Sequence, residues 1–327
     1  MAYTKLGTET AKVDPAKRAL TFAFNGGPGS ASIWLPIGAL GPKRVGMKAN
    51  GESLPPPDPR AEIWRIRCFC RPPPRARGIT TSAVAPWRWG DLRTALTAAE
   101  KLVQDKDAPA LRRGAAWPAA EKAALAQEIA ALPGMPEAFV LQRNLRNEIA
   151  TFATQRLEAQ DGSVGAFRLP VDGHPVPARA GARPEFDPSD EAVLGNDTAC
   201  FNDDVRRELN YESDLPDQAL TGEVCPWNYR NVQNEDLNTA ELLHQAMSRN
   251  TRRKVWIANG SFDLATPCFA TDCTVRQMGL AAAVRGDVTQ TFYEGGPMMD
   301  RVPTELAKRK MDAAKFFDPT LTSVGVW

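Results

Sequence analysis

The segment that decides the fold lies near the C-terminus and reads Arg253-Lys254-Val255-Trp256-Ile257-Ala258-Asn259-Gly260. Its β-branched and aromatic residues predict a strand over residues 253–258, which Asn259-Gly260 would close. The sequence then predicts a helix over 269–279, a second strand over 288–293 and a terminal helix over 304–317. This order of strands and helices predicts an α/β fold in which the two strands lie in one parallel sheet.

A glycine-rich loop near the N-terminus forms a second motif. The apolar, β-prone run Leu20-Thr21-Phe22-Ala23-Phe24 ends at Asn25-Gly26-Gly27-Pro28-Gly29-Ser30. An apolar run that ends at glycine and proline predicts a buried strand followed by a tight loop. Because glycine lets the backbone approach a ligand closely and proline presets the turn, the loop is suited to presenting backbone N–H groups.

Both this loop and the segment Asn259-Gly260-Ser261-Phe262-Asp263-Leu264-Ala265-Thr266-Pro267 resemble the serine carboxypeptidase family. Members of this family are α/β-hydrolases that remove C-terminal residues from peptides with a Ser, Asp and His triad. The resemblance covers residues 1–57 and 91–318. It implies an incomplete α/β-hydrolase fold with a helical cap and several central strands missing, a peptide substrate or peptide C-terminus as partner, and no cofactor.

The resemblance also implies a division of the chain and a role for each motif residue. Residues 1–57 would hold the first strands and the oxyanion loop, 58–90 a disrupted segment, 91–250 the cap, and 251–327 the C-terminal core. Asp263 would be the triad acid, and Gly27 would donate to the oxyanion. Asn25 and Gly26 would bind the free carboxylate of the substrate.

Two of the family's catalytic groups are absent from the sequence. The family's Gly-His-Met-Met loop reads here as Gly296-Pro297-Met298-Met299, and proline has no titratable group. The Gly-Glu-Ser-Tyr-Gly turn that carries the nucleophile appears nowhere. His174, in a Gly/Pro-rich stretch, and His244, on an expected helix, are better explained as solvated or partly packed residues. We therefore expect an inactive carboxypeptidase, with a peptide-binding pseudoenzyme or a non-functional remnant as alternatives.

The composition of the chain changes between residues 54 and 89, where proline and arginine alternate without the period of 2 or 3.6 residues typical of strands and helices. One interpretation is an extended linker that cannot offset its ordering entropy. The other, which we favour because the resemblance stops near 57 and resumes near 91, is a reading-frame slip combined with loss of the segment bearing the nucleophile. Further on, we expect helices over 91–131 with Pro118 near a helix start, over 137–158 and over 200–209, and irregular chain over 161–197.

Composition excludes several other classes of protein. The 327 residues include 40 Lys plus Arg and 39 Asp plus Glu, so no charge imbalance indicates nucleic acid or a membrane surface. The chain opens on polar residues without a signal-peptide core, so it would be cytoplasmic if translated as written, although the family is usually exported; the location stays open. The six cysteines lack metal-type spacing and are expected to be thiols, with a Cys268–Cys273 disulfide as the alternative. Substrate preference and oligomeric state stay open.

Overall fold

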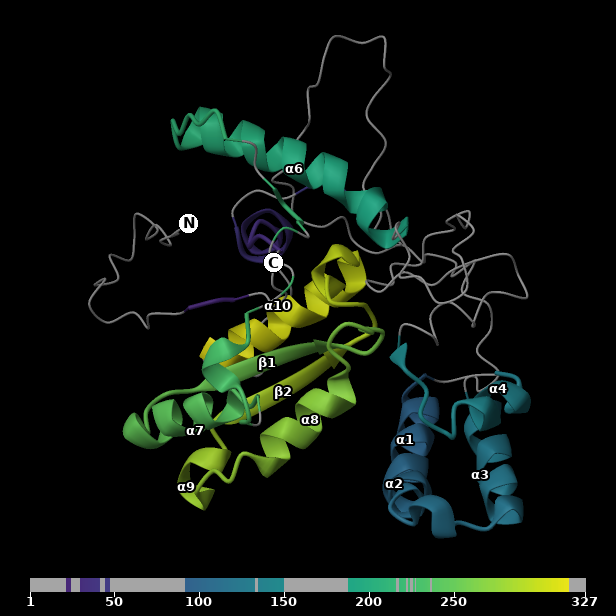
Figure 1. Cartoon of the computed structure of the whole chain (residues 1–327). Coiled ribbons are helices and arrows are strands. Elements are labelled where there is room, and N and C mark those ends of the chain that lie inside the picture. Colours follow the sequence, from purple (N-terminus) through teal and green to yellow (C-terminus); the bar gives the residue numbers. More distant parts are fainter. Residues whose placement is uncertain are drawn as a thin grey trace.

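The coordinates are a computed structural model that describes residues 22–24, 30–41, 45–47, 92–132, 135–149, 188–215, 218–221, 223, 226, 228–235 and 237–317 (Figure 1). Asn25, Gly26, Gly27, His174 and the segment 58–90 lie outside these residues. The predictions made for them, including the roles of Asn25, Gly26 and Gly27, therefore stay predictions, as does the division of the chain at 57, 90 and 250.

The C-terminal part forms a small α/β unit. Strands β1 (Val255–Gly260) and β2 (Val288–Tyr293) pair in parallel, with Val255 opposite Val288 and Gly260 opposite Tyr293. Helices α8 (Cys268–Gln277) and α9 (Ala282–Arg285) connect them. After β2 come the 3-10 turn η7 (Met299–Arg301) and helix α10 (Pro303–Phe317). The predicted strands and helices of this region are thus confirmed, although the first strand begins two residues later than predicted and includes Asn259 and Gly260. The α/β class is confirmed in so far as a two-stranded parallel sheet lies among helices.

Helices cover both faces of this sheet, as Figure 1 shows for α10 on one side and α8 on the other. On one face the ring of Trp256 lies 5.9 Å from that of Phe316 in α10. On the other face Val255 and Val288 pack against a core shared by α7 (Ala240–Arg249), α8 and α9. Because side chains alternate along a strand, β1 and β2 each contribute residues to both layers. The core of this second layer consists of Met247, Met278, Leu280 and Val284.

A second, all-helical unit precedes it in the chain. It comprises α1 (Leu92–Leu102), the π-helical segment η3 (Val103–Asp107), α2 (Ala108–Leu111), the 3-10 turn η4 (Gly114–Ala116), α3 (Ala119–Ala131) and α4 (Glu137–Gln142). Pro118 directly precedes α3, as the sequence predicts, because its fixed φ suits a helix start. The core of this unit consists of Leu125, Ala126, Ala130, Phe139, Val140 and Leu145.

Two predicted boundaries between helix and loop were wrong. The helix expected over 137–158 is interrupted after Gln142, because Asn144 (φ 52°) and Leu145 (φ 65°) turn the backbone into the left-handed region. Residues 150–158 of this prediction lie outside the described residues. The irregular stretch expected over 161–197 already contains the start of α6 (Pro188–Glu208) at Pro188. A proline followed by Asp190 and Glu191 is a helix-start signal, which the charged and glycine-containing sequence around it had obscured.

The strand expected over residues 20–24 is also wrong where the structure describes it. Phe22 and Phe24 belong to neither a helix nor a strand, and they are 72% and 84% exposed. A strand forms only with a partner, and β1 and β2 are the two strands of the single sheet among the described residues. Nearby, Ile37 of the π-helical segment η2 (Leu35–Leu40) and Val45, which follows that segment, pack with Cys200 of α6.

Candidate functional site

The loops that follow β1 and β2 lie side by side at the carboxyl ends of the strands. The N–H of Ser261 donates to the carbonyl of Tyr293 and that of Phe262 to the carbonyl of Gly295, both at 2.8 Å. A Cβ atom at Gly260 would lie 2.2 Å from the carbonyl oxygen of Gly296. The two loops therefore meet backbone to backbone, and the glycines are required by this close approach.

Asp263 lies in the first of these loops and is 7% exposed. Its Oδ1 accepts the N–H groups of Ala265 and Thr266, both at 2.8 Å, and its Oδ2 accepts the Thr266 hydroxyl at 2.6 Å. The carboxylate thus fixes the turn that leads through Pro267 into α8. The position after a parallel strand is that of a triad acid, and these hydrogen bonds of the carboxylate are to its own loop.

Pro297 lies in the second loop, half-buried in a turn that buried Met298 and Met299 follow. The structure thus brings the predicted acid position and the predicted base position into adjacent loops. Proline can neither accept nor donate a proton, so Pro297 cannot act as a general base for Asp263 to orient. His244 lies on α7, as predicted, where its Nδ1 is 3.6 Å from Oε2 of Glu241.

No activated nucleophile takes the place of the missing serine in the described part of the chain. The Ser30 hydroxyl accepts the indole N–H of Trp34 at 3.0 Å. Burial raises the pKa of the Cys268 thiol, and the carboxylates of Glu100 and Asp263 raise it further, so this thiol is protonated at neutral pH. Cys268 and Cys273 are both free, so the alternative of a local disulfide is wrong.

A network of buried charges lies directly behind the Pro297 loop, and the sequence had not revealed it. Arg301, 2% exposed, forms an ion pair with fully buried Asp197 of α6. Asp300 forms a second ion pair with Arg309 of α10 at 3.0 Å. Burial raises the pKa of Asp197, although the Arg301 guanidinium acts in the opposite direction. These pairs hold the loop after β2 to α6 and α10.

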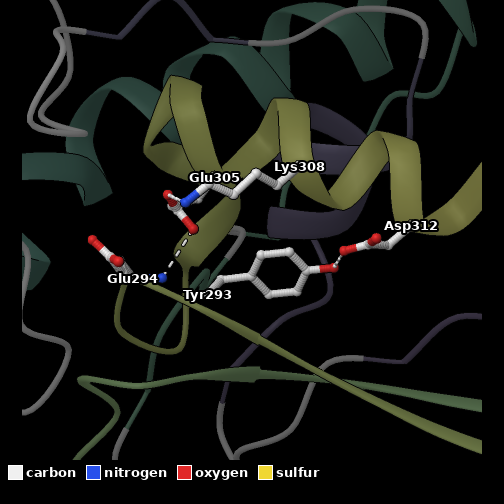
Figure 2. Close-up of polar contacts among 5 residues, drawn as sticks. All are labelled: Tyr293, Glu294, Glu305, Lys308 and Asp312. Atoms are coloured by element: carbon white, nitrogen blue, oxygen red, sulfur yellow. Dashed lines mark hydrogen bonds and ion pairs between the residues drawn. The ribbon is translucent and has the colours of Figure 1, made fainter. Parts of the chain in front are cut away.

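Helix α10 extends this network along the end of the sheet (Figure 2). Glu305, 3% exposed, accepts the backbone N–H of Glu294 at 2.9 Å and the ammonium group of Lys308 at 2.5 Å. The Tyr293 hydroxyl donates to Asp312 at 3.0 Å, and burial together with this bond raises the pKa of Tyr293 to about 12. The spacing of residues 305, 309 and 312 on one helix face is the signal that could have indicated a polar contact surface.

Comparison with known proteins adds nothing to this geometry: no protein-family model, no curated protein and no solved structure matches the chain. The described residues contain no group of three or more His, Cys, Asp or Glu side chains that could hold a metal ion. Of the helices that the structure describes, none combines the length and the apolar character required to cross a membrane.

Proposed function

We propose that this chain is a catalytically inactive relative of the serine carboxypeptidases, built on an α/β-hydrolase core from which central strands are missing. The contact between the Asp263 loop and the Pro297 loop supports this proposal. In α/β-hydrolases the triad acid and the triad histidine come from successive loops at the carboxyl edge of the sheet. The order β1, Asp263 loop, α8, β2, Pro297 loop, α10 reproduces that arrangement.

Acyl transfer requires a nucleophile, a base, an orienting acid and donors for the oxyanion. Asp263 occupies the position of the acid, Pro297 replaces the base, and the sequence contains no nucleophile elbow. An orienting carboxylate has no catalytic effect without an imidazole to orient. Any remaining function is therefore recognition of a peptide C-terminus, with Asn25 and Gly26 as ligands for the carboxylate and Gly27 as an additional backbone donor.

Activity and recognition are tested together on the purified full chain. A fluorophosphonate probe and a blocked dipeptide substrate are expected to give neither labelling nor hydrolysis, and a circular dichroism spectrum with helical content shows that the chain is folded. Stoichiometric labelling of any serine would contradict the proposal. Fluorescence polarisation then compares a peptide that has a free C-terminus with its amidated form.

The free C-terminus is expected to bind better by about 1 kcal/mol, the net contribution of a hydrogen bond to a charged group. Asn25→Ala should remove this preference, while Asn50→Ala, in the same N-terminal region but outside the glycine-rich loop, should leave it unchanged. Equal affinity for both peptides would reject the recognition function and leave a family remnant without it.

A further inference from the structure

The α1–α4 unit contains a cavity of about 370 Å³ that none of the motifs discussed above uses. Its lining includes Trp117, Lys122, Asn144 and Arg146, from the turn before α3, from α3 itself and from the turn after α4. This volume lies within the range of about 300–1,000 Å³ typical of small-molecule sites. The cavity is therefore large enough for a ligand of one ring and one charged group.

The polar part of the lining carries two positive charges and no negative one. The Lys122 ammonium group donates to the side-chain oxygen of Asn144, and the Arg146 guanidinium donates to its backbone carbonyl at 3.5 Å. An ammonium group has three N–H donors and a guanidinium group five, so both cations retain donors for a ligand. Asn144 thus gathers two cations at one place.

The acidic groups near the cavity lie outside its lining. Glu121 forms an ion pair with Arg113 at 2.5 Å. Burial raises the pKa of Asp107, while the nearby Arg146 guanidinium acts to lower it. Neither acid belongs to the cavity lining. An anion that enters the cavity therefore meets donors and cations without a competing carboxylate in the wall.

The backbone that presents Asn144 and Arg146 is strained. A left-handed conformation costs a residue such as Leu145 about 1–2 kcal/mol, since its Cβ crowds the backbone. The side chain of Leu145 is 4% exposed in the core of the unit, and burying a leucine contributes about 1.5–3 kcal/mol. Core packing of Leu145 therefore offsets the strain and holds its two neighbours at the cavity.

An aromatic wall completes the cavity. The half-buried indole of Trp117 packs against the core and lines the cavity together with Leu111. Flat rings stack favourably on such a surface, and a phosphate group with two negative charges matches the two cations. We propose that this cavity binds a small phosphate monoester that carries a flat ring.

Calorimetric titration of the full chain with phenyl phosphate tests this inference. Benzyl alcohol, which has the ring without the charge, and inorganic phosphate, which has the charge without the ring, are the comparison ligands. Phenyl phosphate should bind more tightly than either, and its affinity should fall as salt is added, because exposed charges are screened. Equal binding of benzyl alcohol or of inorganic phosphate would overturn the proposal, as would no binding at about 10 mM phenyl phosphate, the weak end of small-ligand affinity.

Charge-removing variants assign the binding to this cavity. Lys122→Gln and Arg146→Gln should each weaken binding by about fivefold, which corresponds to about 1 kcal/mol for a charge-assisted contact at a partly exposed site. Lys101→Gln, on α1 of the same unit and outside the cavity lining, is the matched control and should bind as the parent does. Equal losses in Lys122→Gln and Lys101→Gln would place the ligand elsewhere and reject the site. Circular dichroism of each variant verifies that its fold is unchanged.

Discussion

Replacement of Arg301 by methionine is expected to destabilise the chain by about 3–5 kcal/mol, the cost of leaving one member of a buried ion pair without its partner. Arg301 is 2% exposed and its partner Asp197 is fully buried, so water cannot replace the lost contact. Oδ1 of Asp197 already lacks a hydrogen bond in the native structure. The variant would therefore leave an entire carboxylate in the interior without compensation from Arg301.

A second replacement separates the cost of an unpaired charge from the value of the pair itself. The double variant Asp197→Leu with Arg301→Met removes both charges of this pair, and apolar groups fill their places. Such replacements are often neutral or stabilising, so the double variant should recover most of the loss and lie within about 2 kcal/mol of the parent. As a surface control, Arg276→Met breaks the exposed Arg276–Asp272 pair and should cost less than about 1 kcal/mol.

Urea unfolding at pH 7, followed by far-UV circular dichroism and tryptophan fluorescence, measures these differences. The pH dependence provides an independent check. Arg301→Met removes a cause that lowers the pKa of Asp197, so this pKa should rise further above its unfolded value. A raised carboxyl pKa contributes stability at low pH that is lost as pH rises through it, so the deficit should shrink toward pH 4. A deficit below about 1 kcal/mol, or a double variant no more stable than Arg301→Met, would refute the reasoning.

Three further outcomes are expected. Gly260→Ala would place a Cβ atom 2.2 Å from the carbonyl oxygen of Gly296. Differential scanning calorimetry should therefore show that the free energy of unfolding of the C-terminal unit falls by several kcal/mol. A change below about 1 kcal/mol would contradict the packing of the two loops. Because the pKa of Tyr293 is raised to about 12, its contribution to folding stability is present below about pH 10 and is lost as pH rises through 12. Tyr293→Phe should therefore flatten the fall in melting temperature above pH 10. An unchanged slope would contradict the buried hydrogen bond from Tyr293 to Asp312. Leu145→Ala should lower the free energy of unfolding in urea by about 2–4 kcal/mol. Leu145→Gly should be at least as stable as Leu145→Ala, because glycine adopts φ 65° without strain. A Gly variant clearly less stable than the Ala variant would show that the strain is negligible.

The secondary structure of the C-terminal unit was predictable because its signals are local. The β-prone run over residues 288–293 lies between glycine-containing turns, and the structure confirms it as β2 with the same bounds. The preceding strand and the flanking helices follow from apolar periodicity and from punctuation by glycine and proline in the same way. Where neighbouring residues alone determine a segment, the sequence predicts its secondary structure.

The errors arose where the outcome depends on distant residues. Residues 22–24 have high strand propensity, but propensity without a pairing partner does not produce a strand. The left-handed turn at Asn144 and Leu145 depends on the core that receives the leucine, which local propensity does not encode. The signal for the start of α6 was local and was simply outweighed by the charged and glycine-containing sequence around it.

The candidate site shows the same division. The places of Asp263 and Pro297 on successive loops follow from the order of strands, and the structure brings these loops together. The ion pair between Asp197 and Arg301 joins residues 104 positions apart, and no spacing rule connects them. The two residues meet only because α6 packs against the loop after β2.

The open edge of β1 links the fold to the proposed loss of activity. Val255 donates to the carbonyl of Asp287 and Ser261 to that of Tyr293, so alternate residues of β1, starting with Val255, face β2. The intervening residues, among them Trp256 and Ala258, direct their backbone groups to the opposite edge, where no strand stands among the described residues. Under the proposed function, the missing central strands, among them the one that carries the nucleophile, belong on this side of β1. On this proposal, the loss of these strands explains both the missing serine and the absence of a further strand beside β1 among the described residues. A strand edge without a partner is a recognised cause of association between chains.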